Sequence, residues 1–305
     1  MTPSGIVLLD KKPGITSMAS DNFIKKRAGT KKVGHSGTLD PFATGLLPIF
    51  VGDALKVVRY TDDYDKAYRC TARFGLRTDT MDSEGEVISR KEFSPEELSE
   101  LSASDFKAIR DAFSEISEIT EQMPPSYSAK KIDGRKAYEL AREGQKVELQ
   151  PCPVKIFSLL IDSIGIVDGM IDVTFDVSCS KGTYIRVICD DVGEMTGFHA
   201  HAIALRRTAC GPFRVEDAIT EEEISEMAGK GDFSFLLDRA LALSQMEKVE
   251  LTAPEFSDVK LGRKIKAGSD IRDGILYAAY HKGELAAVLK KDGDIMRIDR
   301  MLARI

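Results

Sequence analysis

Apolar side chains alternate strictly with polar ones over residues 171–179, in the order IDVTFDVSC. Because successive side chains of a β-strand point to opposite faces, this alternation predicts a strand with one buried face and one exposed face. Further strands are expected at residues 6–9 and 68–74, and helices at residues 17–28 and 105–116. The chain is therefore expected to have a mixed α/β (α+β) fold.

The first of these helices carries the usual signals at both of its ends. Ser17 is a suitable N-cap residue, and Gly29 is a suitable stop after Ala28. A strand-like run is expected at residues 183–188, in which Tyr184 and Arg186 are two positions apart and would share a face. Ile185 and Val187 would then point the other way, into the core.

The pattern changes after about residue 244. Short apolar runs there are separated by turn dipeptides, at Gly268-Ser269, Asp273-Gly274, Lys282-Gly283 and Asp292-Gly293. A chain of 305 residues is long enough for two domains. We expect a larger domain over residues 1–245 and a small all-β module over residues 246–305.

Composition excludes several classes of protein. The sequence has no run of about 18 apolar residues, so a membrane-spanning helix is not expected. The N-terminus lacks the basic segment of a signal peptide. The five cysteines are odd in number and form no CxxC pair, so a disulfide framework or zinc site is not expected. A reducing, cytoplasmic location is the simpler interpretation.

Common cofactor motifs are also absent from the sequence. It contains no GxxxxGK[ST], GxGxxG or HExxH, and residues 34–37 lack the GxSxG spacing of a hydrolase. His199 and His201 are two apart but have no further ligand at metal spacing, and are expected to be ordinary polar residues. Neither a cofactor nor a metal ion is therefore expected.

Charge is unevenly distributed along an acidic chain of net charge −6. Residues 1–60 hold nine Lys and Arg against four Asp and Glu, and residues 251–305 hold eleven against eight. A local basic face can bind phosphates even when the whole protein is acidic. On charge alone, a chance asymmetry explains the pattern equally well.

The densest candidate for chemistry is residues 34–48, GHSGTLDPFATGLLP, where glycines allow tight turns and close approach to a ligand. Asp40 is the one carboxylate in this segment. Asp followed by Pro41 is also a good N-cap pair, so Asp40 could cap a helix. From the residues alone the cap is favoured, because caps are far commoner than catalytic carboxylates.

The same segment resembles the catalytic motif GHxGTLDPxATGxLP of the TruB family of tRNA pseudouridine synthases. Other elements resemble that family in order: KAYR at 66–69, GLRTDTMD at 75–82, PPSYSAKK at 124–131, GRKAYELAR at 134–142, SKGTYIR at 180–186 and LRRT at 205–208. The likeness covers about residues 5–215. One departure is Lys12, where the family usually has proline after Lys11.

The resemblance implies a pseudouridine synthase fold, with a central mixed, largely antiparallel sheet flanked by helices. It implies isomerisation of a uridine to pseudouridine in the T arm of tRNA, at tRNA position 55, without a cofactor. Asp40 would be the catalytic carboxylate and Arg186 the guanidinium that keeps it ionised. Tyr68 would stack on the target base, and is the candidate base for a ribose proton.

The resemblance also implies residues that bind the substrate, namely His35, Tyr184, Leu205, Lys11 and Lys130. For each site residue an ordinary structural role is the alternative: a salt bridge for Arg186, a strand tyrosine for Tyr68, a loop histidine for His35 and plain core for Leu205.

The implied partner is tRNA, contacted at its T arm, elbow and acceptor stem. Phosphate contacts are expected from Lys25-Lys26-Arg27 with Lys31-Lys32, and from Lys130-Lys131 with Arg135-Lys136. Residues 121–151 could form an RNA-clamping insertion, and residues 246–305 correspond to the family's PUA-type RNA-binding module. A monomer without an obligate protein partner and without a membrane is expected.

Three other functions remain open at this stage. A guide-RNA-dependent enzyme of the dyskerin type shares the catalytic motif but works with partner subunits. A tRNA-folding chaperone would bind tRNA but would not need a nucleophile. An unrelated hydrolase could use His35, Ser36 and Asp40, although the spacing of the nucleophile motif is wrong.

Overall fold

The computed structural model describes residues 3–125, 131–132, 135–136, 149–268 and 271–303. The N-terminal body consists, in chain order, of β1 (Gly5–Lys11), α1 (Ser17–Ala28), β2 (Val33–His35), β3 (Thr44–Val51), η1 (Gly52–Thr61), β4 (Lys66–Phe74), β5 (Leu76–Thr78), β6 (Val87–Arg90), α2 (Pro95–Ala103), α3 (Lys107–Ile116), β7 (Glu121–Gln122), β8 (Lys131–Ile132), β9 (Arg135–Lys136), β10 (Cys152–Pro153), β11 (Ile156–Val167), β12 (Met170–Cys179), α5 (Ile185–Thr196), β13 (Ala200–Cys210), β14 (Phe213–Arg214), η2 (Val215–Asp217), α6 (Glu221–Gly229) and η3 (Arg239–Leu243). The C-terminal module consists of β15 (Glu247–Glu250), α7 (Ala253–Lys260), β16 (Ile265–Lys266), β17 (Leu276–His281), β18 (Glu284–Asp292) and β19 (Ile295–Met301). Within the described ranges, no helix is long and apolar enough to cross a membrane.

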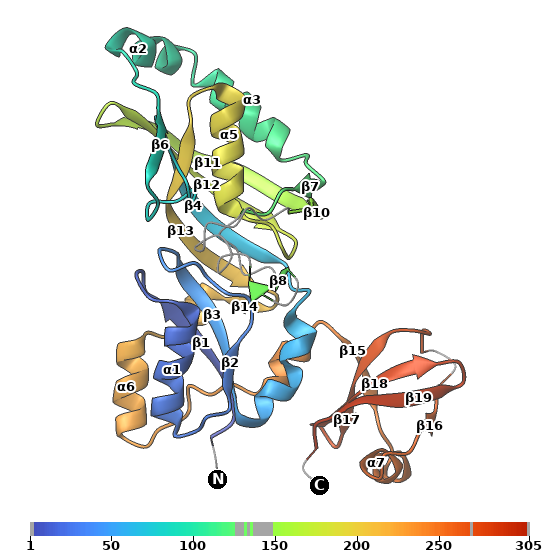
Figure 1. Cartoon of the computed structure of the whole chain (residues 1–305). Helices are drawn as coiled ribbons and strands as arrows, with labels where there is room; N and C mark the ends of the chain where they lie inside the picture. The colour runs from blue at the N-terminus through green and yellow to red at the C-terminus, as the bar shows by residue number, and fades with distance from the viewer. Residues whose placement is uncertain (1–2, 126–130, 133–134, 137–148, 269–270, 304–305) are drawn as a thin grey trace.

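The body is built on one eight-stranded sheet. Its strands run in the order β1-β3-β13-β4-β12-β11, with β2 paired to β3 and β14 paired to β13. Adjacent strands are antiparallel except β3 and β13, which run parallel. This confirms the predicted central mixed, largely antiparallel sheet, and Figure 1 shows helices flanking it.

One face of this sheet carries the main core. The alternation at residues 171–179 is confirmed, because Ile171, Val173 and Phe175 are fully buried while the residues between them are partly exposed. Phe113 of α3 packs on Phe175, with ring centroids 4.9 Å apart. Helices α3 and α5 therefore cover the face of the sheet on which the site described below lies.

Helix α1 spans Ser17–Ala28, as predicted, but its N-cap residue differs from the one that the sequence signals indicated. Thr16, not Ser17, is the N-cap residue, and its side chain accepts a hydrogen bond from the Ala19 N–H. The end is as predicted, with Gly29 in the left-handed conformation. The Ser17 hydroxyl instead bonds both the N–H and the C=O of Leu39, at 2.9 and 3.0 Å, so it holds the loop before Asp40.

The prediction of a strand at residues 183–188 was wrong, since helix α5 starts at Ile185. Residues 185–190 are all buried, although Arg186 and Asp190 lie four positions apart, on one side of the helix. A short and largely apolar run of this kind does not distinguish a strand from a buried helix segment. Arg186 therefore lies in the first turn of a helix, and does not share a strand face with Tyr184.

The two halves of the sheet join at a narrow point. Only Arg206 and Arg207 of β13 pair with β3, opposite Thr44 and Gly45. Gly45 has a φ of +94°, and a Cβ on it would lie 2.4 Å from the carbonyl oxygen of Arg207. Glycine is required at this junction, because a side chain would force the two strands apart.

We expect Gly45→Ala to lower the free energy of unfolding by about 3 kcal/mol, from steric overlap and left-handed backbone strain together. Gly169→Ala is the matched control, since Gly169 has a φ of +76° with nothing within 4 Å of its Cβ position. It should lose only about 1 kcal/mol. Urea unfolding of both variants measures the difference, and equal losses would contradict the steric argument.

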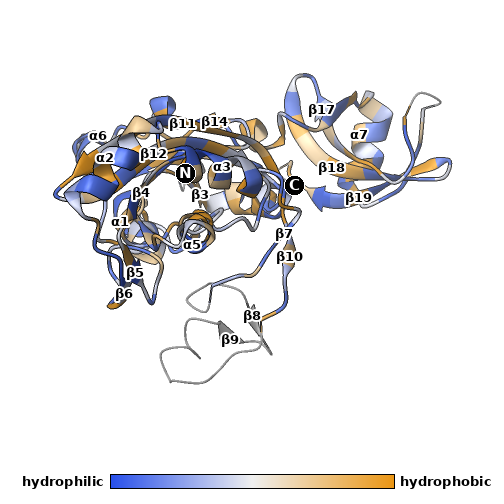
Figure 2. Ribbon diagram, turned by 90° about the horizontal axis from the view of Figure 1, so that it is seen from above, coloured by the Kyte–Doolittle hydropathy of each residue, from blue (hydrophilic) through white to orange (hydrophobic). Residues whose placement is uncertain are grey.

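The C-terminal module forms a five-stranded sheet in the order β15-β17-β18-β19-β16. It is not purely strands and turns, because Thr252 and Glu255 form a reciprocal capping box that starts helix α7. Figure 2 shows the module beside the body. The two share an apolar core that includes Phe50 and Val288, and the Tyr60 hydroxyl bonds Asp299 across the contact.

Candidate active site

A cavity of about 250 Å³ opens where β3, β4 and β13 meet the start of α5. Its walls come from four separate segments of the chain. The lining residues are Gly37, Thr38, Leu39, Asp40, Lys66, Tyr68, Gly182, Thr183, Tyr184, Ile185, Arg186, Leu205 and Arg207. The structure thus brings together Asp40, Tyr68, Arg186, Tyr184 and Leu205, five of the residues predicted for the site.

Asp40 and Arg186 form an ion pair in this cavity. The Nε of Arg186 donates to Oδ2 of Asp40 at 2.8 Å, and its Nη1 donates to the Thr80 carbonyl at 2.6 Å. Nη1 also lies 3.5 Å from Oδ2 of Asp82. The Arg186 side chain is 3% exposed and that of Asp40 is 37% exposed, so the carboxylate faces the cavity while the guanidinium is enclosed.

Asp40 does not cap a helix. The chain bends after it and enters strand β3 at Thr44. The helix-capping alternative, which the residues alone favoured, is therefore wrong. Pro41 supports a bend here and not a first helical turn.

Burial raises the pKa of Asp40 above its ordinary value, and the neighbouring Asp82 carboxylate adds to this. The charges of Arg186 and Lys11 act in the opposite direction without outweighing burial. The carboxyl therefore binds its proton more tightly than an exposed aspartate does. Ionisation of Asp40 is consequently sensitive to pH above the usual carboxylate range.

Lys11 and His35 were predicted to bind substrate, but neither lines the cavity. Lys11 is fully buried, and its ammonium donates to the carbonyls of Lys12, Pro41 and Ala43 at 2.7–3.1 Å. Burial lowers the pKa of Lys11 to about 8. Because Pro41 and Ala43 directly follow Asp40 in the chain, Lys11 fixes the segment that carries this carboxylate.

His35 supports the same loop from its other side. Its Nδ1 lies 2.9 Å from Oδ2 of Asp21, and its Nε2 lies 3.2 Å from Oγ1 of Thr38. The histidine thereby links helix α1 to the loop that carries Asp40.

Tyr68 lies in the cavity wall on β4, directly opposite Arg207 of β13. Burial raises the pKa of Tyr68 to about 12. Its phenol is therefore uncharged at neutral pH, which suits a ring that stacks and disfavours a role as a base. Lys130, the remaining predicted residue, lies outside the described residues.

Three residues of the site were not singled out from the sequence, although they lie inside the quoted motifs. Asp82 lies beside Arg186, and Lys66 and Arg207 line the cavity. Their positions follow from strand pairings between segments more than 100 residues apart, which no local pattern reveals. Their charged side chains within strands were the only available signal.

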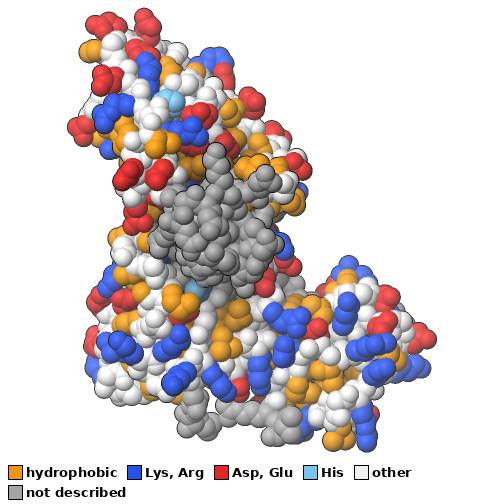
Figure 3. All heavy atoms as spheres, in the orientation of Figure 1, with side chains coloured by type: hydrophobic (Ala, Val, Ile, Leu, Met, Phe, Trp, Pro, Cys, Tyr) orange, Lys and Arg blue, Asp and Glu red, His pale blue; other side chains and the backbone are white. Residues whose placement is uncertain are grey.

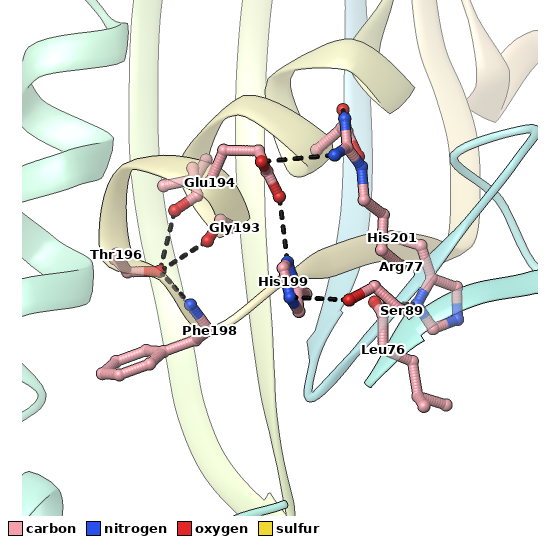
Figure 4. Close-up of polar contacts among 11 residues, drawn as sticks. Leu76, Arg77, Ser89, Gly193, Glu194, Thr196, Phe198, His199 and His201 are labelled. Atoms are coloured by element: carbon pink, nitrogen blue, oxygen red, sulfur yellow. Dashed lines mark hydrogen bonds and ion pairs between the residues drawn. The ribbon is translucent and has the colours of Figure 1, made fainter. Parts of the chain in front are cut away.

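A short hairpin of β5 and β6 holds α5 in place behind the cavity. Arg77 makes two hydrogen bonds to Asp190, at 2.7 and 2.8 Å, and contacts Glu194 at 3.2 Å. Figure 4 shows His199 between Glu194 and Ser89, at 2.9 and 2.8 Å. The hairpin therefore fixes the helix whose first turn carries Arg186.

The histidine pair has no metal-binding arrangement. His201 is buried, with its Nδ1 3.0 Å from the Leu76 carbonyl, while His199 bonds protein side chains. Among the described residues, no group of three or more His, Cys, Asp or Glu side chains could hold a metal ion.

Basic side chains gather on part of the surface. Figure 3 shows Lys and Arg over the lower part of the body and on the C-terminal module. Lys26, Arg27, Lys31 and Lys32, at the end of α1 and in the loop after it, are exposed. These residues belong to the first cluster predicted to contact phosphates.

The chain matches two family models in adjoining stretches. Residues 25–185 match the N-terminal domain of TruB family pseudouridylate synthases, and residues 186–244 match the C-terminal domain of tRNA pseudouridylate synthase B. A tRNA pseudouridine synthase B of Streptococcus gordonii is 38% identical over 292 residues, which are 95% of this chain and 97% of that protein. One of Syntrophus aciditrophicus is 38% identical over 303 residues, 98% of this chain and 91% of that protein.

Solved structures share the fold at lower identity. A Cbf5–Nop10–Gar1 complex contains a chain with a TM-score of 0.71 and 24% identity, matched over 98% of this chain and 85% of that one. An H/ACA ribonucleoprotein bound to a substrate RNA gives a TM-score of 0.70 at 22% identity, over 98% and 85% of the two chains.

The sheet, its C-terminal module and these relatives define a pseudouridine synthase, which is an isomerase. Within that class, the chain belongs to the TruB family.

Proposed function

We propose that this enzyme converts one uridine in the T arm of tRNA, at tRNA position 55, to pseudouridine, with Asp40 as the catalytic carboxylate. The observation that carries the proposal is the contact of 2.8 Å between Asp40 and Arg186 at the wall of an open cavity. The relatives named tRNA pseudouridine synthase B, matched over nearly their whole lengths, support tRNA as the substrate. The reaction would take place in the cytoplasm.

The isomerisation breaks the bond between N1 of uracil and C1′ of ribose, and forms a bond between C5 and C1′ after the ring turns. The proton displaced from C5 is balanced by one gained at N1, so no oxidant or group donor is consumed. The ionised Asp40 oxygen acts at the ribose, as nucleophile at C1′ or as base toward C2′. Arg186 orients it through a guanidinium that is itself fixed by Thr80.

The target base must leave its stack to reach Asp40, at a cost of a few kcal/mol. Tyr68 offers an aromatic face and Leu205 an apolar wall that replace the lost stacking. The exposed basic residues after α1 and the C-terminal module would hold the RNA backbone. Binding of this kind weakens steeply as salt is raised.

The rate of the chemical step should fall as pH decreases through the pKa of Asp40. Because burial raises that pKa, the fall should begin above the range of an ordinary aspartate, whose pKa is about 4. Single-turnover rates with saturating enzyme, measured across pH alongside the dissociation constant, separate this effect from loss of binding. A rate that stays level down to about pH 4 would contradict the assigned role.

The direct test is to incubate an unmodified tRNA transcript with the purified protein and to map pseudouridine along it. One modified position in the T arm is expected, without added RNA or protein. Activity only with a guide RNA and partner subunits would support the dyskerin-type alternative. Faster tRNA folding without any pseudouridine would support the chaperone alternative.

A further inference from the structure

Two cationic side chains, Lys66 and Arg207, lie in the wall of the same cavity as Tyr68. Lys66 lies on β4 and Arg207 on β13, and both line the cavity. A Cβ built on Gly37 would lie 3.2 Å from Nη1 of Arg207 and 3.7 Å from Cε of Lys66. The two side chains therefore converge in the cavity wall beside Gly37, where a Cβ would crowd the guanidinium of Arg207.

The hydrogen bonds of these cations are incomplete. Arg207 is 1% exposed, and its Nε donates to the Leu46 carbonyl at 2.7 Å. Its Nη2 is buried with no hydrogen-bond partner among the described residues. Lys66 donates to the Tyr64 carbonyl, and the described part of the chain offers neither residue an ion pair. A buried donor left unsatisfied is rare and costs free energy.

The positive charges of Lys66 and Arg207 repel each other. Burial lowers the pKa of Lys66, and the charge of Arg207 lowers it further. Holding two like charges together in a partly dry cavity is unfavourable unless an anion joins them. An arginine fork beside a lysine ammonium is a suitable receptor for phosphate oxygens.

We propose that Lys66 and Arg207, where they line the cavity beside Gly37, form a binding site for one backbone phosphate of the RNA, a phosphate flanking the nucleotide whose base enters the cavity. This deepens the proposed function and rests on it, since the phosphate arrives with the everted uridine. The site would fix the sugar relative to Asp40, and so position the nucleotide without reading its sequence.

The test removes one phosphate charge at a time. A T-arm hairpin is made with a neutral methylphosphonate on either the 5′ or the 3′ side of the target uridine. The nucleotide on the 5′ side of that methylphosphonate carries a 2′-O-methyl group. The phosphodiester hairpin with the same sugar is the reference. Dissociation constants are measured for the wild type and for Lys66→Met, which keeps the length of the side chain.

At one of the two linkages, the methylphosphonate should weaken wild-type binding about tenfold, as loss of a charged hydrogen bond does. Lys66→Met should weaken binding of the phosphodiester hairpin by a similar factor. The two changes together should weaken binding no more than either alone, because they remove the same contact. Arg207→Lys provides a second variant with the same expected coupling if Lys66→Met does not fold.

Lys107→Met is the control, because Lys107 lies on the surface of α3 and pairs with Asp111. It removes the same charge and should leave the effect of each methylphosphonate unchanged. The phosphate site would be overturned if the losses of affinity from Lys66→Met and from the methylphosphonate multiplied at both linkages. It would also be overturned if the methylphosphonate weakened binding at neither linkage. Absence of pseudouridine after reaction of the wild type with an unmodified hairpin, whose target uridine has a free 2′-hydroxyl, would instead overturn the proposed function, and failure of the wild type to bind that hairpin would overturn both.

Discussion

Replacing Asp40 by Asn should reduce pseudouridine formation on the order of 10⁴-fold, as removal of a catalytic carboxylate does in other enzymes. The amide keeps the shape and can still accept a hydrogen bond from Nε of Arg186. It cannot act as a nucleophile or base at the ribose. The loss should therefore appear in the single-turnover rate, with the dissociation constant of the tRNA little changed.

Stability should not fall in the same variant. Because the folded-state pKa of Asp40 is raised, the ionised carboxylate opposes folding at every pH above its unfolded-state pKa of about 4. The amide removes that cost, and Arg186 retains the Thr80 carbonyl and the nearby Asp82. We expect a thermal midpoint equal to or slightly above that of the wild type. An active variant would refute the catalytic role, and an inactive but unfolded one would require Asp40→Glu as a further comparison.

The sequence predicted the elements with strong local periodicity. The alternation in β12 and the glycine that ends α1 are both confirmed, because each depends on contacts within a few residues. It failed at α5, because the mostly apolar run at the start of this helix, residues 185–190, fits a strand as well as a helix. It also missed α7, whose capping box at Thr252 and Glu255 is visible in the sequence.

The candidate site was predictable only in part, for a similar physical reason. Asp40, Tyr68 and Arg186 were named because their motifs resemble a known family, and the structure places them around one cavity. Lys11 was predicted to bind substrate on the same resemblance, but its burial follows from the pairing of β1 with β3, which places it opposite Gly45. The convergence of Lys66 and Arg207 depends on the pairing of β4 with β13, which is set by tertiary packing.

The residues around the cavity and the residues that hold the Asp40 loop should respond differently to substitution. In the proposed mechanism residues such as Asp40 act on the substrate directly, whereas Lys11, Ser17 and His35 hold the loop through hydrogen bonds. Changes to the second group should lower stability and rate together. Changes to the first group should lower the rate alone.

Arg186→Lys is the sharpest test between charge and geometry. Lysine keeps a positive charge near Asp40, but one ammonium cannot reproduce the rigid fork that bonds Asp40 through Nε and Thr80 through Nη1. We expect the single-turnover rate to fall about 10²–10³-fold, as expected when a preorganised electrostatic contact is lost. Binding of tRNA should be mostly kept, because the Arg186 side chain is enclosed and, in the proposed mechanism, acts on the nucleotide only through Asp40.

The same substitution leaves the Thr80 carbonyl without its donor, which should cost about 1–3 kcal/mol of stability. Arg77→Lys is the matched control, because it makes the same chemical change one turn further along α5, at a fork to Asp190 that does not line the cavity. It should lose comparable stability with a much smaller loss of rate. Equal loss of rate in the two variants would mean that Arg186 serves the fold, and that its guanidinium has no particular role beside Asp40.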